Sequence, residues 1–288
     1  MKTQDPPAGL SRRALGAWAV GGGAAMVAGL PQATAQTRPP PPEPTRLKSA
    51  GETLRPEIVG DFGIVAAGRH YAVAAGTRIL MAGGNATDAG VAAVFAAAVA
   101  EISHFGFGGE APTIIYDSGT KDVTVINGQG TAPALATPDK FAQLGMIPGN
   151  GPMGGTIPAM VDAMARALQL NGTMTLDQVM QPAIELADGF VMYNFLAEVF
   201  VSQQKATAKY KTAYDTYYPG GALPRVGEIF RQPNLARTMR VIAAADKAAL
   251  ARTKDRKAAI QAGRRGERTP PAPSMMSSDV PVPHSLTT

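Results

Sequence analysis

Apolar residues at helical spacing predict two consecutive helices near the start of the chain's body. The first covers residues 69–81, and a Gly-Gly pair at 83–84 ends its pattern. Asn85 is a suitable N-cap for the second helix, and Asp88 places a carboxylate in its first turn. Residues 86–102 are almost all small, which indicates a helix that packs closely on every side and is therefore buried.

A β-hairpin is predicted after these helices. Residues 113–116 and 123–126 are rich in β-branched side chains, and a turn-forming Asp-Ser-Gly-Thr sequence at 117–120 connects them. The glycine-rich stretch 106–109 precedes the hairpin and permits close approach of the backbone to a ligand or to another strand. The Asn-Gly-Gln-Gly loop at 127–130 ends the second strand, and functional residues often lie on such loops.

The second half of the body predicts mainly helices. Thr175 is a suitable N-cap, and Pro182 is expected to kink the helix that follows. One long helical stretch carries several tyrosines on an expected polar face. The expected helices cover residues 160–170, 176–187, 191–218 and 234–250. Helices, a hairpin and further helices together predict a mixed α/β (α+β) fold.

Composition narrows the classes of function. The 288 residues are 45% hydrophobic and 17% charged, which is typical of a globular protein. The absence of cysteine excludes disulfides, cysteine nucleophiles and iron–sulfur clusters, and three histidines leave no His-rich metal site. The formal charge of +5 belongs to the two ends, because residues 36–250 carry 17 basic and 18 acidic side chains. A neutral body without a basic stripe argues against a nucleic-acid partner.

Residues 1–35 have the order of an export signal. An arginine pair at 12–13 precedes an apolar stretch at 14–30, and Ala-Thr-Ala at 33–35 forms a small-residue cleavage site. This arrangement resembles a twin-arginine signal and predicts a periplasmic or secreted protein with no stable membrane span once the signal is removed. The alternative is an N-terminal membrane anchor, for which the apolar stretch is short and rich in glycine. Residues 36–60 are expected to form a Pro-rich linker, which is stiff and extended over residues 38–44.

Several short motifs follow one another along the body. A Gly-Gly-Asn-Ala-Thr-Asp-Ala sequence joins the first two predicted helices, and the glycine-rich stretch and an Ala-Pro pair come after it. The later motifs are Gly172-Thr173-Met174, Gln181-Pro182-Ala183, Ala187-Asp188-Gly189-Phe190 and Gln232-Pro233-Asn234-Leu235-Ala236. In this order and spacing, residues 64–250 resemble the large-subunit portion of the gamma-glutamyltransferases, which are N-terminal-nucleophile hydrolases.

The resemblance implies a specific chemistry. Precursors of this family cut themselves, and a threonine that becomes the first residue of the small subunit attacks a gamma-glutamyl amide such as glutathione. Backbone N–H groups of a glycine-rich loop stabilise the oxyanion, and no metal or organic cofactor is implied. The implied fold is a four-layer αββα sandwich built from both subunits. This chain is therefore expected to form an incomplete sandwich, to lack the small subunit and to aggregate through an exposed sheet edge and apolar face.

The loop after the second predicted strand departs from the family. Typical members carry an arginine and a glutamate where this sequence has Gln129 and Gly130. Arginine suits the α-carboxylate of the substrate, because its planar guanidinium forms two parallel hydrogen bonds with a carboxylate. We assign Gln129 and Gly130 as candidate substrate-binding residues with an altered acyl specificity. A related acylase or amidohydrolase fits equally well, and an ordinary polar loop residue is the alternative for Gln129.

No residue at the end of the sequence corresponds to the nucleophilic threonine that the resemblance implies. Residues 251–288 predict a basic and then Pro- and Ser-rich tail, which is either disordered or translated from a shifted frame after about residue 264. The family's nucleophilic threonine lies further downstream. Ser103 and His104 are neighbours and are not expected to form a catalytic pair, because such groups usually come from distant segments. The open hypotheses are an acyl-transferring enzyme precursor, a non-catalytic fragment or pseudoenzyme, and an exported binding protein.

Overall fold

Residues 58–149 and 151–266 are described by a computed structural model, and the structural statements below refer to these residues. The predicted export signal, most of the predicted linker and the end of the predicted tail lie outside them.

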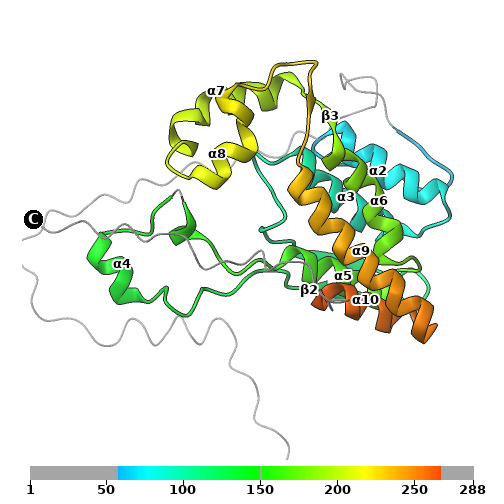
Figure 1. Cartoon of the computed structure of the whole chain (residues 1–288). Helices are drawn as coiled ribbons and strands as arrows, with labels where there is room; N and C mark the ends of the chain where they lie inside the picture. Colours follow the sequence, from blue (N-terminus) through cyan, green and yellow to red (C-terminus); the bar gives the residue numbers. More distant parts are fainter. Residues whose placement is uncertain (1–57, 150, 267–288) are drawn as a thin grey trace, which may run out of the picture. The chain divides into compact units, whose positions relative to one another are not determined.

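Helices dominate the described residues, and two short hairpins interrupt them (Figure 1). The helices are α2 (His70–Met81), α3 (Ala86–Ala100), α4 (Pro138–Leu144), α5 (Met160–Asn171), α6 (Leu176–Asp188), α7 (Asn194–Thr207), α8 (Lys211–Tyr217), α9 (Pro233–Thr253) and α10 (Arg256–Arg265). The strands are β1 (Thr113–Tyr116), β2 (Val123–Ile126), β3 (Phe190–Val191) and β4 (Ile229–Phe230). Two 3₁₀ turns, η2 (Pro152–Gly154) and η3 (Pro219–Gly221), complete the order.

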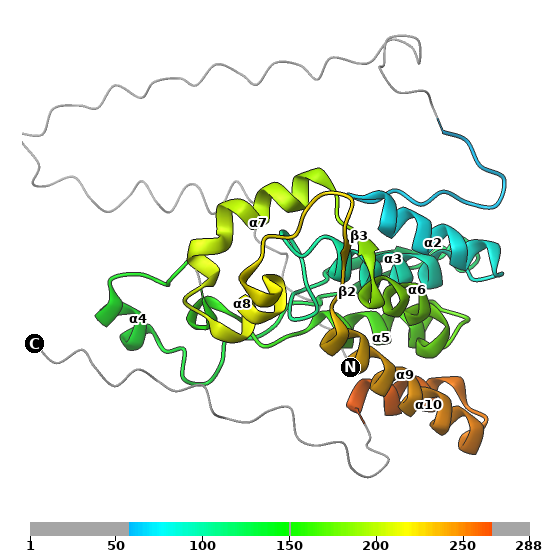
Figure 2. The ribbon, with the colours of Figure 1, turned by 45° about the horizontal axis from the view of Figure 1, so that its top comes forward.

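Helix α3 lies at the centre of the helical layer. Helices α2, α5 and α6 pack against it, and α9 covers the other side of α6 (Figure 2). The alanines and valines of α3 let the neighbouring backbones approach closely, while the fully buried ring of Phe95 fills the remaining space. The prediction of a buried, small-residue helix is confirmed for most of α3, but not for every side of it, because Gly90 is exposed.

Side chains at the helix starts provide the predicted caps. Asn85 and Asp88 form a reciprocal capping box at the start of α3, and Thr175 forms one with Gln178 at the start of α6. Helix α6 continues as one helix across Pro182, which is buried.

Two antiparallel hairpins form the β structure. Strand β1 pairs with β2 from Thr113 opposite Ile126 to Tyr116 opposite Val123, at the predicted bounds. Strand β3 pairs with β4 through Phe190 and Phe230. Within the described residues each sheet has two strands, so the β layers of a sandwich are only partly present. The mixture of helices and small sheets confirms the predicted α/β class.

One face of the β1–β2 hairpin is apolar and exposed. It consists of the cross-strand pairs Ile114–Val125 and Tyr116–Val123, and each of these side chains is at least 59% exposed. The opposite face turns toward the core, where Ile115 and Ile126 contact buried residues. A hairpin that is apolar on both faces needs a second layer over its exposed face.

The stretch 191–218 differs from the prediction of one helical segment with a polar tyrosine face. It forms β3, α7 and α8 in succession, because Met192 leaves the helical conformation to hydrogen-bond across to Gly227 and Glu228. Tyr218 is 1% exposed, and its hydroxyl donates to the carbonyl of Phe200 at 2.7 Å. The prediction is wrong for Tyr218, because a phenol can bury its ring once its hydroxyl has a partner, whereas Tyr210 is exposed.

The helical part also extends beyond the predicted end at residue 250. Helix α9 continues to Thr253, and α10 lies in the segment expected to be a tail. Lys254 turns the chain with a φ of 58°, and the side chain of Asp255 caps α10. The added helix is explained by its contacts, because α10 packs on both α9 and α5.

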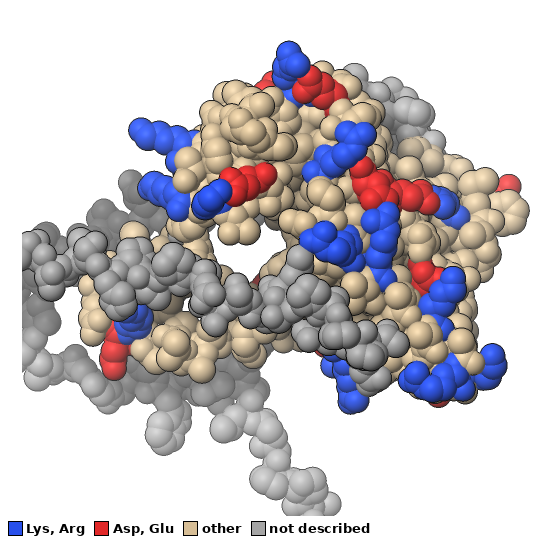
Figure 3. All heavy atoms as spheres, viewed as in Figure 1, with Lys and Arg blue, Asp and Glu red and all other residues tan. Residues whose placement is uncertain are grey.

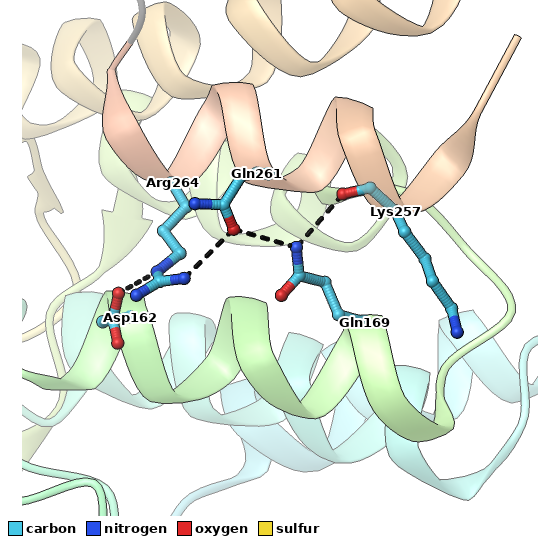
Figure 4. Close-up of polar contacts among 5 residues, drawn as sticks. All are labelled: Asp162, Gln169, Lys257, Gln261 and Arg264. Atoms are coloured by element: carbon cyan, nitrogen blue, oxygen red, sulfur yellow. Dashed lines mark hydrogen bonds and ion pairs between the residues drawn. The ribbon is translucent and has the colours of Figure 1, made fainter.

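Polar contacts join α10 to α5 (Figure 4). The amide of Gln169 donates to the carbonyl of Lys257 and to Oε1 of Gln261, both at 3.1 Å. Arg264 pairs with Asp162 at the other end of the same interface.

Charged side chains of both signs are interspersed on the face shown in Figure 3. Exposed ion pairs such as Arg78–Glu185 and Arg240–Asp188 contribute little stability individually. No helix in the described part of the chain has the length and apolar character needed to cross a bilayer.

Candidate functional site

A buried carboxylate joins two of the motifs that the sequence singled out. Asp88 is fully buried and accepts hydrogen bonds from the backbone N–H and hydroxyl of Thr173 and from the N–H of Met174, at 2.5–3.1 Å. Asn85 donates its side-chain amide to the carbonyl of Asn171 at 2.6 Å. Gly172 leaves room for this junction, since a Cβ there would lie 2.6 Å from Asp88 Oδ1. The two motifs therefore form one structural junction between α3 and the α5–α6 connection.

Three loops meet beside the β1–β2 hairpin. They are the glycine-rich loop 106–110, the strand-end loop 127–131 and the segment 156–159 that leads into α5. The N–H of Ala111 donates to the carbonyl of Gly128 at 2.9 Å, and the N–H of Ile157 donates to the carbonyl of Thr131 at 3.0 Å. These bonds fix the loops side by side, as expected for a site built from strand-end segments.

The glycine-rich loop offers unused backbone donors. Within the described residues, the N–H groups of Gly106, Phe107 and Gly108 donate to no backbone carbonyl, whereas Gly109 donates to Gly106. Successive N–H groups of this kind can bind an anion or a developing oxyanion.

The predicted site residues Gln129 and Gly130 lie on the strand-end loop. The side chain of Gln129 is exposed. Gly130 faces the neighbouring segment so closely that a Cβ there would lie 1.8 Å from the carbonyl oxygen of Ile157. A side chain at position 130 is thus incompatible with this loop geometry, which gives the glycine a steric reason. Substrate binding by both residues stays a prediction.

Glu110 is a polar residue of this region that the sequence reasoning missed. It is the last residue of the glycine-rich loop, and its Oε1 accepts a hydrogen bond from the hydroxyl of Thr156 at 3.1 Å. The same hydroxyl would lie 2.9 Å from a Cβ added at Gly130. The available signal was an acidic residue immediately after Gly108-Gly109, on a loop already singled out.

A cavity of about 720 Å³ adjoins the end of the glycine-rich loop, where Glu110 and Ala111 line it. The extended segment 62–68, the exposed side of α3 and the start of β1 form its walls, which are largely apolar. Among the described residues, Glu101 and Glu110 are its acidic lining residues, and no Lys, Arg or His lines it. Oε1 of Glu101 is buried without a hydrogen-bond partner among the described residues. The cavity thus carries negative charge in apolar surroundings.

Ser103 and His104 are brought together but lack the rest of a catalytic triad. Ser103 Oγ lies 2.8 Å from His104 Nδ1. The imidazole stacks on Phe195 at 5.5 Å, and the guanidinium of Arg69 lies 4.6 Å from the same ring. No carboxylate among the described residues hydrogen-bonds this imidazole, so the geometry gives the pair no orienting group.

Asp246, a residue of α9, has a second buried carboxylate, which lies beside the N-terminus of α6. It accepts a hydrogen bond from the N–H of Asp177 at 3.1 Å, while its Oδ1 has no partner within the described residues. Burial raises the pKa of Asp246, although the backbone N–H of Asp177 acts in the opposite direction. In the described ranges, no group of three or more His, Cys, Asp or Glu side chains is placed to hold a metal ion.

Known proteins are similar to this chain in sequence and in structure. A glutathione hydrolase proenzyme of Bacillus subtilis (strain 168) is 34% identical over 75% of this chain and 37% of its own length. An acylase proenzyme of Pseudomonas sp. (strain V22) is 33% identical over 64% of this chain and 35% of its own length. The crystal structure of Helicobacter pylori gamma-glutamyltranspeptidase has a TM-score of 0.62 at 27% identity, covering 66% of this chain and 56% of that one.

These similarities set both the family and the extent of the match. The fold of the described residues is that of part of an N-terminal-nucleophile hydrolase. The chain spans little more than a third of the length of these curated relatives. Residues 72–252 match the family described as gamma-glutamyltranspeptidase. Because this match covers more than half of the sequence, the chain belongs to the gamma-glutamyltranspeptidase family.

Proposed function

We propose that this chain forms the large-subunit portion of an enzyme that transfers or hydrolyses the acyl group of a small amide. The observation that carries the proposal is the meeting of the glycine-rich loop, the strand-end loop and the segment before α5 beside an acidic cavity. The family match over residues 72–252 supports acyl chemistry at that place.

Each part of the site has a role in this reaction. A threonine nucleophile from polypeptide outside this sequence attacks the amide carbon and forms a tetrahedral oxyanion. The amine then leaves with the proton that the threonine hydroxyl gave up. Water or a second amine next attacks the acyl-threonine ester, which restores the threonine hydroxyl and releases the acyl group as an acid or as a new amide. The free N–H groups of the glycine-rich loop are suited to bind the oxyanion.

Two versions of the proposal differ in the acyl group that the enzyme accepts. Gamma-glutamyl amides such as glutathione are favoured by the similarity to a glutathione hydrolase. A different acyl group is favoured by the similarity to an acylase and by the neutral Gln129 and Gly130 in the strand-end loop. A non-catalytic member of the family is the competing function.

The exposed hairpin face supports the need for a completing polypeptide. This face is a contiguous apolar surface that is exposed to water unless another polypeptide covers it; it consists of Ile114, Tyr116, Val123 and Val125. We propose that the Thr-bearing subunit packs over this face.

We also propose that the signal at residues 1–35 directs export of the chain. Cell fractionation of the full chain tests this proposal, and the expected result is a periplasmic product that is shorter at its N-terminus.

Complementation tests the proposed function. The full chain is mixed or co-expressed with the Thr-bearing subunit of a family relative, and the release of p-nitroaniline from gamma-glutamyl, alkanoyl and oxamyl anilides is measured. We expect hydrolysis only when both polypeptides are present. A stable complex without activity on any of these amides would support the non-catalytic function instead. The matched control carries alanine in place of the threonine nucleophile.

A further inference from the structure

The glycine-rich loop ends in a carboxylate that has no cationic partner in the structure. Among the described residues, the contact of the Glu110 carboxylate is the hydroxyl of Thr156, and no ion pair involves it. The side chain is partly buried and lines the 720 Å³ cavity. A carboxylate in such a position is stabilised when a cationic group of a ligand binds beside it.

Thr156 relates this carboxylate to the strand-end loop. Its hydroxyl contacts Glu110 and also adjoins the place where a side chain at Gly130 would begin. The space beside Gly130 is therefore reached by an acidic side chain from the glycine-rich loop. Gln129, the neighbouring polar residue, carries no charge.

The charges around the cavity favour one kind of ligand. Glu101 contributes a second carboxylate, with one buried oxygen that lacks a hydrogen-bond partner in the described part of the chain. Because none of the described lining residues is Lys, Arg or His, this part of the lining offers a ligand carboxylate no compensating charge. Two carboxylates in a lining of this kind favour a ligand ammonium group over a ligand carboxylate.

We infer that Glu110 is the specificity-determining residue of the proposed site, and that it selects acyl donors by a free ammonium group and without a requirement for an α-carboxylate. This inference rests on the proposed function and concerns which amide the site accepts. The preferred acyl group is then an aminoacyl group with a cationic amine, such as 4-aminobutyryl, in addition to gamma-glutamyl.

Three small amides separate the two charges of a gamma-glutamyl group. Glutamine carries the ammonium and the carboxylate, 4-aminobutanamide carries the ammonium alone, and glutaramate carries the carboxylate alone. Their binding to the purified full chain is measured by calorimetry or ligand-observed NMR at neutral pH. We expect 4-aminobutanamide to bind at least as tightly as glutamine, and glutaramate to bind about tenfold more weakly, since a charged hydrogen bond is lost.

Variants assign the preference to Glu110. Glu110→Gln keeps the shape of the side chain and should weaken both ammonium ligands about tenfold, with little effect on glutaramate. Glu110→Asp should retain part of the preference. The matched control is Glu198→Gln, because Glu198 is an exposed carboxylate on α7 that does not line the cavity. Melting temperatures of all variants report whether the fold is kept.

The outcomes separate this inference from the proposed function. Glutaramate binding as tightly as 4-aminobutanamide, or an unchanged preference in Glu110→Gln, would overturn the inference while amide hydrolysis in the complemented enzyme still stands. Binding of none of the three amides would overturn the inference for this chain. Complementation then shows separately whether the proposed function fails as well.

Discussion

Thr173 donates both its backbone N–H and its hydroxyl to the buried carboxylate of Asp88, although 85 residues separate the two in sequence. This contact locks the start of α3 to the connection between α5 and α6. The same carboxylate also accepts the N–H of Asn85, so one side chain caps its own helix and holds a distant loop. This polar junction gives Asp88 and the Gly172-Thr173-Met174 motif a shared structural role.

Asp88→Asn is expected to lower the free energy of unfolding by at least about 3 kcal/mol, because several hydrogen bonds to a charged acceptor are weakened and an amide NH₂ meets N–H donors. Urea denaturation followed by circular dichroism measures the change. Asp139→Asn is the control, since Asp139 is an exposed acid in the first turn of α4. A loss below about 1 kcal/mol would show that the junction is unimportant for stability.

Gly130→Ala is expected to destabilise the chain by about 1–3 kcal/mol, because the new Cβ would overlap the carbonyl of Ile157 and force the backbone apart. Gln129→Ala, one residue earlier and exposed, should change stability by less than about 0.5 kcal/mol. Thermal melts of the two variants provide the comparison. Equal melting temperatures would contradict the close approach of the two loops.

Asp246→Asn is expected to stabilise the chain at neutral pH. Burial raises the pKa of Asp246 in the folded state, so the folded chain binds a proton more readily than the unfolded chain. The contribution of Asp246 to the free energy of unfolding is therefore fully present below its pKa in the unfolded chain, which is about 3.9. This contribution is lost as the pH rises from there through the higher pKa of the folded chain. Asparagine keeps an oxygen acceptor for Asp177 and carries no buried charge.

The pH dependence provides the check for Asp246. The difference in unfolding free energy between Asp246→Asn and the unsubstituted chain should be largest near pH 7 and should shrink toward pH 4. Asp255→Asn serves as a comparison, because Asp255 is an exposed cap of α10. A difference that grows as the pH falls would contradict the direction of the shift.

The exposed hairpin face is expected to make the isolated chain self-associate. Replacing the cross-strand pair by Ile114→Lys and Val125→Glu should reduce association and keep the hairpin, since both side chains are more than two-thirds exposed. Light scattering after size-exclusion chromatography measures the particle mass. Val201→Lys on α7 is the control for an isolated exposed apolar residue. An unsubstituted chain that is monomeric with a cooperative melt would contradict the prediction.

Local signals predicted the features that depend on neighbouring residues. The caps at Asn85 and Thr175 and both strands of the first hairpin follow from residue types within a few positions of one another. The contact between Glu110 and Thr156 depends on how two loops pack, and no local pattern encodes it. The sequence therefore predicted which loops form the candidate site, but not that the Glu110 carboxylate lies beside the strand-end loop.

Helix α10 was missed for a different reason. Its sequence is basic and poor in large apolar residues, which is also typical of a tail. Its buried face consists of Ala259, Ile260, Ala262 and Gly263, which bury well only because α5 and α9 are already in place. A small-residue face of this kind becomes a helix signal only when its partners are known.

The fit of α10 also has a genetic consequence. A Cβ at Gly263 would lie 3.0 Å from Leu176 Cδ1 and 3.2 Å from Asp246 Cβ, so the codon at this position specifies a residue matched to two distant helices. Codons read in a displaced phase would give amino acids unrelated to those surfaces. Because α10 fits its neighbours as far as Gly263, the hypothesis of a shifted frame concerns only the residues after it, and resequencing beyond codon 263 tests that hypothesis.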